Sequence, residues 1–72
     1  MDLLRIENSN ELGAAIRGRR HQLELTQEEL ADVARVSLRF VSELERGKES
    51  AQYAGIRRVL DALGLGLYLK PR

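Results

Sequence analysis

A short stretch of the chain carries side chains that can form hydrogen bonds to the bases and phosphates of nucleic acid. A helix over this stretch would place Val41 and Leu44 against a core. Its opposite face would then hold two arginines, a small hydroxyl and one acid: Arg39, Ser42, Glu43 and Arg46. An arginine on such a face can donate two hydrogen bonds to guanine O6 and N7, and a serine allows close approach. The alternative is an ordinary solvated face, because charged residues of any surface helix point outward.

Residues on either side extend this candidate contact set. Thr26 and Gln27 begin a preceding helix, where free N–H groups and the positive end of the helix dipole suit a phosphate, although Thr26 could act only as a cap. Leu38 could contact a thymine methyl group, whereas Phe40, at the boundary of the helical wheel, could contact a base or pack in the core. The predicted DNA-contacting residues are Thr26, Gln27, Ser37, Leu38, Arg39, Phe40, Ser42, Arg46 and Lys48.

Capping signals and hydrophobic periodicity predict the elements that position these side chains. Thr26 followed by Glu29 matches a capping box, and Ser37 can cap the next helix. The expected elements are a helix from Asn8 to about Leu23, a helix of about eight residues after Thr26, a helix from Ser37 to Gly47, a helix from about Gln52 to Leu63, and a strand over residues 65–70. Tyr53 belongs to the apolar stripe of the fourth helix, so we expect it to pack inward. The prediction is a single all-α domain of four to five helices over residues 1–72, with a helical core at 8–63 and a short C-terminal β-strand.

The predicted strand needs a partner, because a lone strand leaves its N–H and C=O groups unpaired. It could pair with residues 3–6 or with the same strand of a second copy. The second arrangement is favoured because burial of the strand's leucines would reinforce a domain of only 72 residues. The predicted dimer interface is Leu65, Leu67, Tyr68 and Leu69. Such a dimer would set two recognition helices about 34–36 Å apart, one turn of DNA or a multiple, which predicts a palindromic site.

One cation and one anion are predicted on apolar helix faces. Arg20 lies at the edge of the stripe formed by Leu12 and Ile16, and Glu45 lies at the inward edge of the third helix. We expect a largely buried ion pair between them, and truncation of either partner would then cost about 3–5 kcal/mol. The alternative is that both side chains extend to the surface.

Composition excludes several functional classes. Without cysteine the chain forms no disulfide or thiolate zinc site, and its one histidine, His21, is too few for a histidine-based metal cluster. Glu28, Glu29 and Asp32 favour a helix dipole rather than catalysis, so we expect no enzyme activity, cofactor or metal. The net charge is +1, with −2 in the first half and +3 in the second, which indicates either an anionic partner or a chance fluctuation. No secretory signal or membrane-spanning run is recognisable, so a cytoplasmic location is expected.

The order of these residues resembles the phage-repressor and Cro-like (XRE) helix-turn-helix family. The resemblance rests on Leu25–Ala31, Val36–Ser37 and Val41–Lys48 and covers about residues 11 to 65. It implies a compact helical DNA-binding domain whose third helix enters the major groove. In that family the pair matching Arg20 and Glu45 is often a buried salt bridge. One departure is Arg35, which stands where the family usually has glycine; a non-glycine residue in a left-handed conformation costs about 1 kcal/mol.

Within that family the chain resembles HipB-type antitoxins more closely. This resemblance rests on Leu12–Arg17 with Arg19 and Arg20, on Arg39–Ser42 and on Arg58–Leu65. It implies a dimer that represses its own operon, a terminal strand paired across the dimer, and a HipA-type Ser/Thr kinase toxin as partner. With no long extension after Arg72, we expect a toxin to contact the folded surface. The alternatives are a free-standing XRE-type regulator without a toxin, and a protein-interaction module that does not bind DNA.

Overall fold

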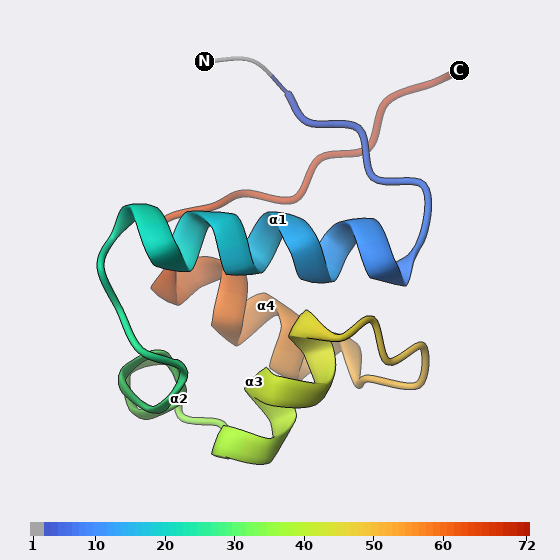
Figure 1. Ribbon diagram of the computed structural model, residues 1–72. Helices are drawn as coiled ribbons and strands as arrows, with labels where there is room; N and C mark the ends of the chain where they lie inside the picture. Colours follow the sequence, from blue (N-terminus) through green and yellow to red (C-terminus); the bar gives the residue numbers. More distant parts are fainter. Residues whose placement is uncertain (1–2) are drawn as a thin grey trace.

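Four helices form within residues 3–72, the part of the chain that the computed structural model describes (Figure 1). They are α1 (Ser9–Gln22), α2 (Gln27–Ala34), α3 (Leu38–Glu45) and α4 (Tyr53–Ala62). α3 packs against each of the other three helices, and α2 also packs against α4. The prediction of an all-helical fold is confirmed, with four helices at the expected places.

Side-chain caps determine where α2 and α3 begin. Thr26 and Glu29 form the predicted capping box: the Thr26 hydroxyl accepts a hydrogen bond from the Glu29 N–H at 3.0 Å, and the Glu29 carboxylate accepts one from the Thr26 N–H at 2.8 Å. The Ser37 hydroxyl accepts a hydrogen bond from the Phe40 N–H at 2.9 Å. These caps satisfy N–H groups that have no partner within a helix, so both starts follow from local sequence.

The apolar faces of the four helices meet in one core. Its largest fully buried side chains are Ile16, Leu30, Val41, Leu44, Val59 and Leu63. α1 and α3 approach so closely that a Cβ atom on Gly13 would lie 2.5 Å from the Leu44 carbonyl oxygen. Tyr53 does not join the core, contrary to the prediction, and is 60% exposed. It lies in the first turn of α4, where its hydroxyl accepts a hydrogen bond from Arg57 at 3.3 Å.

The turn between α2 and α3 is made by a non-glycine residue. Arg35 has φ 60° and ψ 43°, a left-handed conformation, which costs about 1 kcal/mol in a residue with a Cβ atom. The Arg35 N–H donates to the Asp32 carbonyl at 3.3 Å, and the Val36 N–H donates to the Ala31 carbonyl at 3.1 Å. These bonds close the end of α2, so the helix-turn-helix geometry is kept with strain at Arg35.

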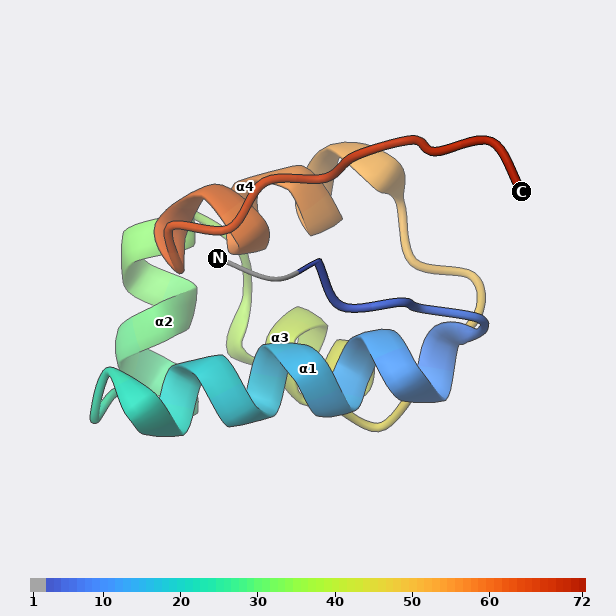
Figure 2. The ribbon, with the colours of Figure 1, turned by 90° about the horizontal axis from the view of Figure 1, so that it is seen from above.

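The C-terminal segment forms no strand in the single chain. Residues 65–72 and residues 3–7 both run on the side of the molecule away from α2 and α3 (Figures 1 and 2). No backbone hydrogen bond is present between residues 3–6 and 65–70. The pairing of residues 65–70 with residues 3–6 is therefore not formed, and the strand paired with a second copy stays a prediction, because a strand requires a hydrogen-bonded neighbour.

Two further features concern the described residues only. Within residues 3–72 no helix is both long and apolar enough to cross a membrane. Over the same range no three acidic or histidine side chains are grouped so that they could hold a metal ion.

Candidate nucleic-acid interface

The outer face of α3 presents polar side chains away from the core. Val41 and Leu44 are buried, whereas the Arg39 side chain is 85% exposed. Arg46 is exposed as well, and Ser42 is half-buried. The structure therefore leaves both arginines of this face available to a ligand, on a helix whose reverse side is fixed in the core.

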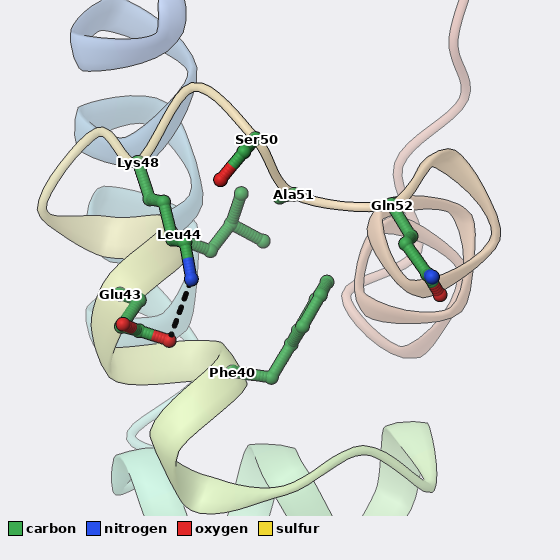
Figure 3. Close-up of a pocket in the computed structure, with 7 residues that line it drawn as sticks. All are labelled: Phe40, Glu43, Leu44, Lys48, Ser50, Ala51 and Gln52. Carbon is green, nitrogen blue, oxygen red and sulfur yellow. Dashed lines mark hydrogen bonds and ion pairs between the residues drawn. The ribbon is translucent and has the colours of Figure 1, made fainter.

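Leu38 and Phe40 differ in what they offer to a ligand. Leu38, the first residue of α3, is 48% exposed, so its methyl groups are accessible. The Phe40 side chain points from α3 toward α4 and packs against the core (Figure 3). Its ring fills the space beside Gly55, where an added Cβ would lie 2.4 Å from Phe40 Cζ. This packing favours the core alternative for Phe40 over a base contact.

A buried ion pair joins α1 to α3 behind this face. Arg20 Nε lies 2.7 Å from Glu45 Oε2, and Arg20 Nη2 lies 2.9 Å from Glu45 Oε1. The two side chains are only 9% and 3% exposed. Arg20 Nη1 also donates to the Leu25 carbonyl oxygen at 2.8 Å. The same guanidinium therefore holds α3 and the connection from α1 to α2.

The Glu45 carboxylate stays ionised despite its burial. Burial by itself would raise its pKa, but hydrogen bonds from Arg20 and Gln27, with the charges of Arg20 and Arg17, hold that pKa below its ordinary value. The hydrogen bond to Glu45 raises the pKa of Arg20. Both groups are charged at neutral pH, because each one favours the ionised form of the other.

The first residues of α2 are engaged within the protein. Gln27 Nε2 donates to Glu45 Oε1 at 3.0 Å, which ties the start of α2 to the ion pair. A carboxamide NH2 group has two hydrogens, so one remains for a phosphate. The Thr26 hydroxyl serves as the helix cap. In this role the hydroxyl accepts a hydrogen bond, so its O–H donor also remains for a ligand. Both residues can therefore still bind a phosphate, and the position of Gln27 is set by Glu45.

Glu43, absent from the predicted contact set, pairs with two of the cations in that set. Its Oε1 atom lies 3.3 Å from Lys48 Nζ and 3.6 Å from Arg39 Nε; Figure 3 shows the contact with Lys48. The spacing of four residues between Arg39 and Glu43 is a signal that could have found the first pair. The second depends on Gly47, whose φ of 90° turns the chain back after α3.

The residues of the predicted dimer interface line an apolar groove along α1. Leu65 is partly buried against the core. Leu67, Tyr68 and Leu69 are 51%, 71% and 100% exposed. Leu3 and Leu4, 66% and 71% exposed, line the same groove. The single chain therefore leaves this apolar surface largely uncovered, on the side away from α2 and α3.

Comparison with known proteins places this geometry among DNA-associated regulators. A model of the helix-turn-helix domain matches residues 11–69. The uncharacterized HTH-type transcriptional regulator y4mF of Sinorhizobium fredii is 43% identical over 63 residues, 88% of this chain and 83% of the relative.

Solved structures of similar fold include HipB and a second bacterial regulator. The HipB-O4 20mer complex gives a TM-score of 0.87 at 23% identity, covering 96% of this chain and 97% of that one. The HipA-HipB-O2-O3 complex gives 0.88 at 23% identity, covering 96% and 97%. The clp gene regulator ClgR from C. glutamicum gives 0.72 at 37% identity, covering 86% and 80%.

Proposed function

Because the chain belongs to the helix-turn-helix domain family, we propose that it is a sequence-specific repressor that inserts α3 into the major groove of duplex DNA. It is a helix-turn-helix transcriptional regulator and not an enzyme. The observation that carries the proposal is the open face of α3, with Arg39 85% exposed and Val41 and Leu44 buried behind it. A rigid helix with exposed arginines on one side matches the width and the hydrogen-bond acceptors of a major groove.

The proposed contacts divide by what they recognise. Arg39 reads a guanine through its terminal nitrogens, and Ser42 and Leu38 allow close approach to neighbouring bases. Arg46 and the second N–H of Gln27 bind phosphates, which fixes the register of α3 in the groove without reading sequence. Glu45 belongs to α3 and accepts a hydrogen bond from Gln27. The distance between the phosphate bound by Gln27 and the base read by Arg39 is therefore fixed.

Fluorescence anisotropy with duplexes selected from a random library tests this proposal. Binding to a selected duplex should weaken by roughly 10³-fold between 50 and 200 mM salt if about six phosphates are contacted. Arg39→Ala should cost about 1–3 kcal/mol and relax the preference at one base pair per half-site. Arg57→Ala removes the same charge from α4 and should leave base preference unchanged. A chain that binds no duplex in a salt-dependent way would instead be a protein-interaction module.

We further propose that two copies bind a palindromic operator and that the dimer is the antitoxin of a HipA-type kinase. The exposed apolar C-terminal segment supports the dimer. The fold shared with HipB over almost the whole chain supports the antitoxin role. A repressor acts on the DNA of the cell, which supports a cytoplasmic location.

A free-standing regulator without a toxin is the second candidate. It is favoured by the 43% identity to a protein named only as a transcriptional regulator, and by the 37% identity to ClgR. Co-purification of the tagged chain from its native host separates the two roles. A kinase encoded by the neighbouring reading frame and retained with the chain supports the antitoxin, whereas DNA retained without a kinase supports the free-standing regulator.

A further inference from the structure

We propose that Glu43 is a positioning residue that holds Arg39 for base reading and weakens binding to DNA of the wrong sequence. The inference rests on the proposed DNA-binding function and adds to it a determinant of specificity. Its basis is the place of one carboxylate between two cations of the candidate interface, 3.6 Å from Arg39 Nε and 3.3 Å from Lys48 Nζ.

The geometry leaves the reading atoms of Arg39 free. A guanidinium group has five N–H donors, and the closest approach of Glu43 to that of Arg39 is at Nε. The terminal nitrogens Nη1 and Nη2 therefore remain for guanine O6 and N7. Because the Arg39 side chain is 85% exposed, it would otherwise sample many rotamers and lose that freedom on binding. A carboxylate that restrains it beforehand lowers this entropic cost at the guanine that Arg39 reads.

Lys48 is held by the same residue in two ways. Its Nζ lies 3.3 Å from the Glu43 carboxylate, and its backbone N–H donates to the Glu43 carbonyl oxygen at 3.1 Å. The left-handed Gly47 makes the turn that brings these groups together. The ammonium has three donors and can still bind a phosphate, but the Glu43 carboxylate partly neutralises its charge. Since phosphate contacts supply most of non-specific binding, this neutralisation weakens binding to any sequence that lacks the right bases.

Folding gives Glu43 little reason to be acidic. It lies in the last turn of α3, where the negative end of the helix dipole disfavours a carboxylate. Its partners are solvent-exposed cations, and ion pairs of this kind add little to stability. A glutamine would fill the same space. The charge is therefore better explained by what α3 binds than by how α3 folds.

The test compares Glu43→Gln with Asp61→Asn, a matched control that removes one negative charge from an exposed residue of α4. The probes are a duplex selected by the wild-type protein from a random library and a scrambled duplex of the same composition. For Glu43→Gln the ratio of affinities, selected over scrambled, should fall about two- to fivefold. Its binding to the scrambled duplex should tighten, with a salt slope steeper by about one because Lys48 is released. Asp61→Asn should keep the wild-type ratio.

A cycle with Arg39→Ala separates positioning from a general charge effect. Discrimination is measured as the ratio of affinities for the selected duplex and for a duplex in which the guanine read by Arg39 is replaced. Glu43→Gln should lower this ratio in the wild-type background and leave it unchanged in the Arg39→Ala background. Equal ratios for Glu43→Gln and Asp61→Asn, or an undiminished effect in the Arg39→Ala background, would overturn the inference while leaving the proposed function intact. Absence of duplex binding by the wild-type protein would overturn both. Urea unfolding that is unchanged in each variant shows that a folding defect is not the cause.

Glu43→Asp keeps the negative charge but draws it back from Arg39. This variant should lose guanine discrimination without binding the scrambled duplex more tightly.

Discussion

The Glu45 carboxylate accepts hydrogen bonds from two other helices, from Arg20 of α1 and from Gln27 of α2. It lies on α3, so this single residue fixes α3 relative to both α1 and α2. The pair is almost fully buried, and its energetic importance is clearest when one partner is lost. Without Glu45, the Arg20 guanidinium would lie in the core without a counter-ion.

Glu45→Ala is therefore expected to lower the free energy of unfolding by about 3–5 kcal/mol. Small domains have only about 5–15 kcal/mol of net stability, so the variant would be marginally folded at room temperature. Urea unfolding followed by circular dichroism measures the effect. Asp61→Ala breaks an exposed pair with Arg57, whose charged atoms lie 3.8 Å apart, and should leave the midpoint close to wild type. Similar shifts in the two variants would show that burial of the ion pair does not matter.

The lowered pKa of Glu45 also predicts how stability depends on pH. Its pKa is lower in the folded chain than in the unfolded chain, so in acid the unfolded chain binds more protons. The stabilisation is complete above the ordinary carboxyl value of 4.5 and is lost as pH falls through the folded-state pKa. In urea unfolding series from about pH 7 to pH 3, the stability advantage of wild type over Glu45→Gln should shrink as the solution becomes more acidic. A difference that stays constant over this range would contradict the assignment.

At the scale of helices, α1 and α3 meet through their backbones. A Cβ at Gly13 would lie 2.5 Å from the Leu44 carbonyl oxygen and 2.6 Å from that of Glu45, whereas a Cβ at Gly18 meets nothing within 4 Å. Gly13→Ala should therefore force α1 from α3 and destabilise the fold by about 1–3 kcal/mol. Gly18→Ala, in the same helix, should stabilise it by about 0.5–1 kcal/mol, because alanine loses less backbone entropy. Thermal unfolding should show shifts of opposite sign, and a common sign would refute the contact.

Local signals explain which elements were predictable. The starts of α2 and α3 followed from Thr26 and Ser37, because a cap acts on N–H groups only a few residues away. Periodicity wrongly predicted that Tyr53 packs inward, since a helical period does not show how far the core extends along α4. The pairing of Glu43 with Lys48 was not predicted, because it depends on the turn that follows α3.

At the scale of the whole molecule, the unpaired C-terminal segment predicts association. The strand proposed for residues 65–70 depends on a second copy, since these residues form no strand in the single chain. Light scattering after size exclusion should give about twice the 8.2 kDa chain mass for wild type. Leu67→Asp should give the single-chain mass, because a charge would enter the proposed interface. Val33→Asp, at a 63% exposed position of α2, is the matched control and should remain a dimer. A monomeric wild type would exclude the proposed pairing.

The contact at Gly13 also limits how this protein can be regulated. The backbones of α1 and α3 are in direct contact, and a buried ion pair lies beside this contact. α3 therefore has no room to slide or tilt within its own domain. In the proposed dimer, a signal that releases DNA would then act on the spacing or association of the two copies, and each domain would leave the DNA as a rigid unit.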